Sequence, residues 1–126
     1  MADYTPVQVL AGAPFTSQAS GTITGGDVVM VSGSGTVAAA SAGALTVVGV
    51  AAHDAVSGAK VAVHPFKAVH ETLAGVGGVT AGNPLKVGAT AGKLVLWTTG
   101  TDSAAAWVGI ALTTAIADAT LRWIGR

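Results

Sequence analysis

The sequence contains no cysteine, which excludes disulfide bonds, thiolate metal sites and cysteine nucleophiles and fits synthesis in a reducing cytoplasm. Charged residues are also scarce, since they make up 10% of the 126 residues, compared with about a quarter in an ordinary soluble domain. The six basic and six acidic side chains balance, and the basic ones are scattered along the chain. Nucleic-acid binding depends on clustered positive charge, so we expect no nucleic-acid partner.

Long apolar runs are missing too. The longest weakly polar stretch, residues 37–52, is rich in small side chains and ends at His53 and Asp54. It is shorter than the roughly 20 apolar residues of a membrane-spanning helix. The first residues also lack the basic and apolar regions of a secretory signal. We therefore expect no membrane partner.

Aromatic residues make up only 5% of the chain although apolar residues make up 51%, so the apolar excess is mainly alanine and valine. Such small side chains each bury little area, and a core built from them stabilises the fold less per residue than one of leucine and phenylalanine. A weakly charged chain of this kind is expected to expose apolar surface when alone. Exposed apolar patches usually mark protein–protein contacts, so the composition predicts binding to further copies or to another protein.

Glycine and proline are frequent, with 18 and 4 residues, and they divide the chain into short segments rich in valine and threonine. Five such segments are residues 28–31, 46–50, 60–63, 93–97 and 107–111. Short β-branched runs bounded by turn-forming residues indicate strands joined by tight turns. The length is enough for one domain. The predicted fold is therefore all-β, as a compact sandwich or a small barrel.

An internal repeat links the two parts of the chain. The matching segments are residues 26–31 with 82–87, 48–51 (VGVA) with 108–111 (VGIA), and 59–63 with 119–123. The repeat predicts a single β domain over residues 21–126, built from halves at residues 21–74 and 78–126 that pack face to face around one core. The glycine inside each VG(V/I)A segment indicates a bulge or a close approach of two backbones.

Residues 1–20 precede the repeat and have no counterpart in it. They form either an edge strand or an extended arm that reaches a neighbouring molecule, and the sequence leaves both possibilities open. The apolar side chains of this segment and one tryptophan are candidate interface residues: Tyr4, Val7, Val9, Leu10, Phe15 and Trp97. Trp97 is included because it stands just before a turn at residues 98–102, and tryptophan is enriched at binding hot spots. The other tryptophans are expected to fill the core.

The nearest approach to a metal site is the group His64, His70 and Glu71. Two histidines six residues apart share one side of a strand only if that strand is unbroken, and Pro65 argues against this regularity. Zinc sites also use closer histidine spacings. We therefore expect neither a metal ion nor another cofactor.

Catalytic motifs are also missing. His53 and Asp54 have no nucleophile elbow to accompany them. The glycine-rich residues 88–94 are one residue too short for a phosphate-binding loop and precede a predicted strand instead of a helix. The six acidic residues are spread singly along the turns. The sequence thus predicts a protein that is not an enzyme and has no catalytic residues.

The order of these segments resembles the capsid decoration, or cement, proteins of tailed phages. The resemblance covers residues 21–125 and rests on the segments GDVV (26–29), VGVA (48–51), AGNPL (81–85), KLV (93–95) and VGIA (108–111). It implies a β-rich body that binds the outside of an expanded viral capsid and stabilises the shell by bridging subunits. The implied partners are the major capsid protein and further copies of the chain, in a homotrimer. An alternative function is a carbohydrate- or receptor-binding β domain of a virion fibre or spike.

Overall fold

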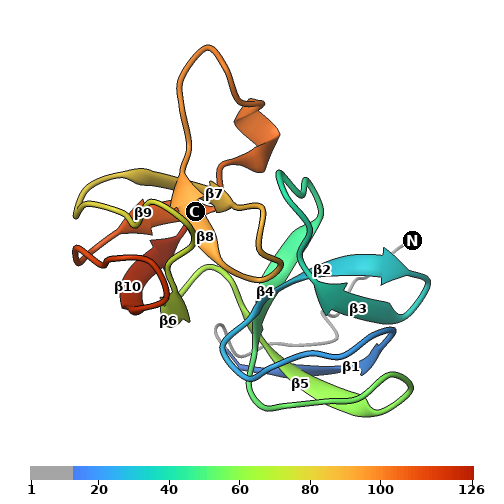
Figure 1. Cartoon of the computed structure of the whole chain (residues 1–126). Helices are drawn as coiled ribbons and strands as arrows, with labels where there is room; N and C mark the ends of the chain where they lie inside the picture. Colours follow the sequence, from blue (N-terminus) through green and yellow to red (C-terminus); the bar gives the residue numbers. More distant parts are fainter. Residues whose placement is uncertain (1–12) are drawn as a thin grey trace, which may run out of the picture.

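The computed structural model describes residues 13–126 and contains two β units joined end to end along the chain (Figure 1). The strands of the first unit are β1 (Phe15–Ala19), β2 (Val28–Gly33), β3 (Thr36–Ala39), β4 (Val47–Ala51) and β5 (Lys60–Pro65). Those of the second are β6 (Val69–Leu73), β7 (Pro84–Val87), β8 (Leu94–Leu96), β9 (Gly109–Ala111) and β10 (Thr120–Gly125), with a short 3-10 helix, η1 (Ala104–Ala106). The predicted all-β fold is confirmed. Within the described range, no helix has the length and apolar character needed to cross a membrane.

The first unit is a closed barrel in which the strands follow the order β1-β3-β2-β4-β5. Alternation of side chains sets its inside and outside: on β5, Val61 and Val63 are buried, whereas Lys60 and His64 are exposed. β1 runs parallel to β3 and antiparallel to β5, so it has a partner on both sides. The described part of the predicted arm or edge strand therefore includes a barrel strand, and residues 1–12 lie outside the described residues.

The second unit repeats this path in the order β6-β10-β9-β7-β8. Strands β6 to β10 correspond one by one to β1 to β5, so each unit begins with a strand that the sequence repeat did not include. The junction falls between β5 and β6, at residues 66–68, whereas the sequence analysis placed it at residues 74–78. The second unit is also less completely closed, because a single parallel bridge between Ala74 and Leu94 replaces the β1–β3 pairing.

Equivalent hydrogen bonds show that the two units share details of their turns. The backbone N–H of Thr24 donates to the side-chain carboxylate of Asp27 at 3.0 Å, and the N–H of Thr80 donates to the side-chain oxygen of Asn83 at 2.9 Å. Aspartate and asparagine both support such local turns. The repeat inferred from the sequence is thus a structural repeat.

Each unit has its own interior, lined by eight buried apolar residues at corresponding positions. Those of the first unit are Ala19, Ile23, Val29, Val37, Ala51, Ala55, Val61 and Val63. Those of the second are Ala74, Val79, Leu85, Leu94, Ala111, Ala115, Leu121 and Trp123. The expectation of one core shared by two facing halves is therefore wrong, because each half forms its own barrel-like interior.

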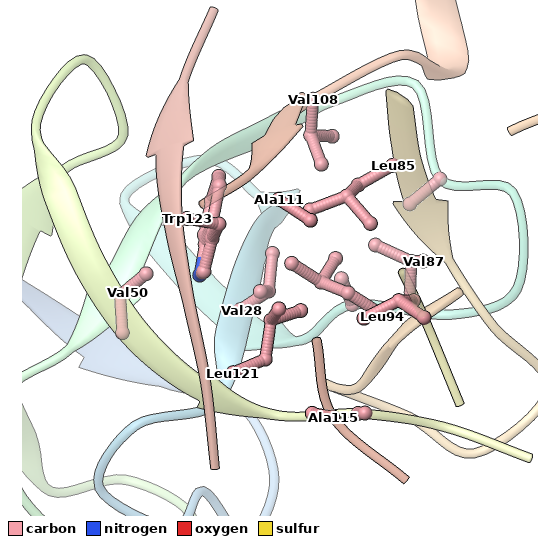
Figure 2. Close-up of a cluster of buried hydrophobic side chains, with 14 residues drawn as sticks. Val28, Val50, Leu85, Val87, Leu94, Val108, Ala111, Ala115, Leu121 and Trp123 are labelled. Carbon is pink, nitrogen blue, oxygen red and sulfur yellow. The ribbon is translucent and has the colours of Figure 1, made fainter. Parts of the chain in front are cut away.

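The units are joined where the outer face of the first barrel packs onto the second interior. Val28 and Val50 point outward from the first barrel and belong to the buried cluster that contains Trp123 (Figure 2). Ala40 belongs to it as well, and its carbonyl accepts a hydrogen bond from the N–H of Gly92 at 2.9 Å, while the Gly92 carbonyl accepts one from Val28 at 3.1 Å. The first barrel thereby covers the less completely closed side of the second.

The glycines of the VG(V/I)A segments mark close backbone approaches, as the sequence predicted. A Cβ atom on Gly49 would lie 2.0 Å from the carbonyl oxygen of His64 on β5. A Cβ atom on Gly109 would lie 2.2 Å from the carbonyl oxygen of Ile124 on β10. Only glycine lets the two backbones pair at this distance.

Candidate interaction surfaces

The histidine and acidic group singled out in the sequence has a structural explanation. His70 is buried, its ring centroid lies 5.1 Å from that of Trp123, and its Nε2 is 2.9 Å from the carbonyl oxygen of Pro65. Burial lowers the pKa of His70, so the neutral ring with Nε2–H donating to that carbonyl is favoured. Glu71 instead pairs with Arg122 at 2.7 Å. The described part of the chain holds no cluster suited to a metal ion.

His53 also has a structural role. Its Nε2 accepts a hydrogen bond from the backbone N–H of Ala62 at 3.2 Å, so Nδ1 carries the proton and donates to the carbonyl of Asp54 at 2.9 Å. In the second unit, the hydroxyl of Thr113 accepts the equivalent N–H, that of Arg122, at 3.0 Å. A threonine thus fills the position of His53, which identifies the position as a support for the turn and not as a catalytic site.

The connection between β8 and β9 is the clearest departure from the repeat. It comprises residues 97–108 and includes η1, whereas the equivalent β3–β4 connection comprises residues 40–46. The longer connection projects from the body of the molecule (Figure 1, orange). We call residues 97–108 the projecting loop. Because the repeat folds without this extra length, its residues are candidates for a function beyond folding.

Two stacked tryptophans stand at the two ends of the projecting loop. The ring centroids of Trp97 and Trp107 are 5.9 Å apart with an angle of 28° between the planes, and the guanidinium of Arg126 lies 4.5 Å from the Trp107 ring centroid. Both indole N–H groups donate to backbone carbonyls, Trp97 to Ser103 and Trp107 to Gly109, at 2.8 Å each. Both rings are half-buried. Their indole N–H groups thus already have hydrogen-bond partners, so apolar ring surface is what they offer to a partner.

An ion pair holds the loop at its base. The Nζ of Lys86 on β7 lies 2.6 Å from one carboxylate oxygen of Asp102, and the other oxygen accepts the backbone N–H of Thr98 at 2.7 Å. The hydrogen bond from Lys86 holds the pKa of Asp102 below its usual range. Arg126 adds a hydrogen bond to the carbonyl of Ala104 at 3.0 Å. These contacts hold the loop in one conformation in the unbound protein.

The outer face of the second sheet carries a second exposed surface. Ile124 on β10 pairs directly with Val69 on β6 and with Ile110 on β9, and all three side chains are exposed. Leu112 and Leu73, also exposed, extend this surface. We call these five residues the outer apolar face. Several exposed aliphatic side chains side by side on one sheet are typical of a protein–protein contact.

Two recesses of the surface bear on small-molecule chemistry, and the one of about 330 Å³ is lined by His64, His70 and Glu71 among other residues. The other, of about 530 Å³, lies between residues 42–43 and the second unit, and its lining is mainly glycine, alanine and valine. Its charged residue, Lys86, is already paired with Asp102. A catalytic pocket needs several polar groups that converge on one point, and this recess does not provide them.

The candidate interface residues fall into different places. Trp97 is half-buried at the start of the projecting loop, and Phe15 is half-buried on β1, packed against the first interior. Tyr4, Val7, Val9 and Leu10 lie outside the described residues. Of the remaining tryptophans, Trp123 fills the second interior as expected, whereas Trp107 belongs to the stacked pair.

The sequence analysis missed the outer apolar face, Trp107 and Arg126. The sequence of β10 could have revealed that face. Leu121 and Trp123 are apolar on one side of the strand, and Ile124 is apolar on the other. A strand in a barrel with one face in water normally alternates, so Ile124 breaks the expected pattern.

Comparison with known proteins identifies a similar fold. Neither a protein-family model nor a curated protein sequence matches the chain. Among solved structures, the chain is similar to the head fiber gp8.5 N base in bacteriophage phi29, with a TM-score of 0.69 and 19% sequence identity. The match covers 90% of this chain and 92% of that one. At this identity the similarity establishes a shared fold over nearly the whole length of both chains.

Proposed function

We propose that this protein is a non-enzymatic structural component of a phage head, bound to the outer surface of the expanded capsid as a decoration, or cement, protein. The observation that carries the proposal is the fold shared with a phage head fiber base over 90% of the chain. The segment order seen in the sequence resembles that of phage decoration proteins, which supports the same assignment.

The surface chemistry also supports a binding role. The described residues contain no cluster suited to a metal ion, whereas the outer apolar face exposes aliphatic side chains and the projecting loop carries two half-buried tryptophans. The proposed partners are the major capsid protein and further copies of this chain in a homotrimer. A copy that bridges neighbouring subunits stabilises the shell through many modest contacts, which act together because each raises the effective concentration of the next.

The projecting loop is the proposed contact with the capsid. It is longer than the equivalent β3–β4 connection, its two tryptophans offer apolar ring surface, and Lys86 pairs with Asp102 at its base. A rigid aromatic contact loses little conformational entropy on binding, which is why tryptophan is common at binding hot spots.

Binding to purified capsids tests this proposal. The protein is expected to sediment with expanded capsids, to leave unexpanded precursors unbound, and to raise the temperature at which the shells rupture. Trp107→Ala is expected to weaken capsid binding about tenfold or more, as for a hot-spot residue. Leu45→Ala is the matched control, because Leu45 is an exposed apolar residue on the equivalent β3–β4 connection of the first unit. Failure of the unmodified protein to bind expanded capsids would contradict the proposal.

A second candidate function is binding of a carbohydrate or receptor by a fibre or spike domain. The stacked pair Trp97 and Trp107 favours it, because sugar rings pack well on exposed aromatic surfaces. Bound glycan would change the tryptophan fluorescence, and Trp107→Ala would remove that change. If a broad glycan panel leaves the fluorescence unchanged while capsids bind, the second candidate is excluded.

A further inference from the structure

We propose that the part of the outer apolar face around Ile110 binds the β2–β3 hairpin of a second copy, so that the molecules associate head to tail. The proposal deepens the self-association part of the proposed function by naming the two surfaces that meet. It rests on the internal repeat and does not require capsid binding.

Inside the chain, two different surfaces already meet in this way. One is the outer face of the first barrel, represented by Val28, Ala40 and Val50, which are 0%, 0% and 5% exposed. The other is the β7–β8 hairpin of the second unit, where the carbonyl of Val87 accepts the N–H of Gly43 at 3.0 Å and Gly92 bonds to both Val28 and Ala40. The contact is therefore heterologous, between an outer face and a hairpin.

One part of the outer face of the second unit, around Pro84 and Ile110, corresponds to the covered face of the first, whereas the equivalent of Ile124, His64, is exposed. In the first unit, the N–H of Ala40 donates to the carbonyl of Val28 at 2.8 Å; in the second, the N–H of Trp97 donates to the carbonyl of Pro84 at the same distance. Val28 pairs with Val50 on the neighbouring strand, and Pro84 pairs with Ile110 in the same way. The equivalent of a covered valine is thus an exposed isoleucine, since Ile110 is 39% exposed.

The β2–β3 hairpin of the first unit is exposed, whereas the equivalent β7–β8 hairpin of the second unit is covered. Val31 on β2 corresponds to Val87 on β7, and the two are 46% and 1% exposed. Gly35 and Gly92 occupy the same place in the two hairpin turns, with φ of +74° and +77°. Each unit therefore lacks the contact that its counterpart makes: the first has an open hairpin and the second an open outer face.

A second copy of the chain fits these two open surfaces. The outer face of one molecule can meet the hairpin of the next, as the first barrel meets the second hairpin within the chain. Glu71 and Arg122, which lie beside this part of the face, are paired with each other, so neither brings an unpaired charge to the contact. Repetition of a heterologous contact gives a closed ring or a filament, and a homotrimer is such a ring.

One difference makes the contact between copies weaker than the contact within the chain. Val28 donates its N–H to Gly92, but the equivalent residue, Pro84, has no N–H. The intermolecular contact therefore lacks one backbone hydrogen bond, and it meets a unit that is already closed by the β1–β3 pairing, so it depends more on Ile110 and Val31. We expect the assembly to dissociate when the protein is diluted.

Sedimentation velocity of the full-length protein without capsids, over a range of concentrations, tests this inference. Ile110→Lys and Val31→Lys each place a charge in one of the two surfaces, and each is expected to weaken association at least tenfold. The matched controls are Ile116→Lys and Val56→Lys. These two residues occupy equivalent positions outside both surfaces, and they are 78% and 68% exposed. Both controls are expected to associate like the unmodified protein.

Mixing the two weakened variants gives the sharpest test. Each variant retains one intact surface, so an equimolar mixture is expected to form a dimer with one copy of each, although each alone is monomeric. Near-UV circular dichroism of the tryptophans in the diluted samples checks that both variants are folded. The inference is overturned if the unmodified protein stays monomeric at all concentrations, if only one variant loses association, or if the mixture stays monomeric. Monomeric protein that still binds capsids would overturn this inference and the homotrimer, and would leave the proposed capsid binding standing.

Discussion

The two units follow the same strand path, but the second barrel is closed less completely than the first. The first interior is filled by small residues such as Val61 and Val63, and its barrel closes through β1 and β3. The second holds Leu121 and Trp123 at the same positions, and its first and third strands share a single bridge. Larger side chains need a wider interior, and the outer face of the first barrel covers the side left less closed. The comparison shows how two units of a repeat can differ so that the outer face of one fits the open side of the other.

The largest expected effect concerns the two interiors. Trp123→Ala removes a fully buried ring and its hydrogen bond to the hydroxyl of Thr72, and we expect it to lower the free energy of unfolding by about 3–5 kcal/mol. Val63→Ala, at the equivalent position of the first unit, removes two methyl groups and should cost about 2 kcal/mol. Chemical denaturation measures both. Equal losses would contradict the different roles given to the two interiors.

The next effect concerns the contact between the units. A Cβ on Gly92 would lie 2.8 Å from the side chain of Asp27 in the other unit, whereas a Cβ on Gly35 would have no neighbour within 4 Å. Both glycines have positive φ, so Gly92→Ala and Gly35→Ala share a backbone cost of about 1–2 kcal/mol. Gly92→Ala should cost about 1–3 kcal/mol more because of crowding at the contact. Thermal unfolding of diluted protein compares them, and a smaller loss for Gly92→Ala than for Gly35→Ala would argue against a tight contact.

A smaller effect is expected from pH, at a position where the units differ. His70 on β6 corresponds to Phe15 on β1, and burial lowers the pKa of His70 below 6.5. Between pH 6.5 and this lower value the unfolded chain binds more protons than the folded one, so the free energy of unfolding decreases as the pH falls through that window. His70→Phe should remove this contribution, which unfolding curves recorded from pH 7.5 to 5 would show. An unchanged pH dependence would mean that His70 is not the group responsible.

The smallest effect concerns the projecting loop. Asp102→Asn removes the ion pair with Lys86 but keeps a side chain of the same size. Partly exposed ion pairs contribute little to global stability, so the melting temperature should hardly change. Amide hydrogen exchange in residues 97–108 should become faster, because the loop opens locally. Unchanged exchange would show that the stacked tryptophans hold the loop without the ion pair.

The sequence was sufficient to predict the strands that carry a visible repeat. Both VG(V/I)A segments need glycine for the same close backbone approach, so the pattern is preserved in both units. β1 and β6 escaped detection because Phe15 corresponds to His70 and the two strands have no residue pattern in common. A barrel interior constrains size and polarity and not identity, so such strands can be matched only through their partners.

The candidate surfaces were less accessible from sequence. Trp97 could be singled out by the turn that follows it, but its stacking on Trp107 depends on a loop closure that brings together residues ten positions apart. The outer apolar face joins the consecutive strands β9 and β10 to β6, which lies far from them in the chain. Whether an outward residue is covered depends on the packing of the units, and that packing has no local signal in the sequence.

The most direct test is a reconstruction of expanded capsids incubated with the protein. The account predicts density on the outside of the shell, with residues 97–108 facing the capsid protein and the face around Ile110 covered by a neighbouring copy. Capsids without added density, or bound copies whose face around Ile110 remains open to solvent, would contradict it.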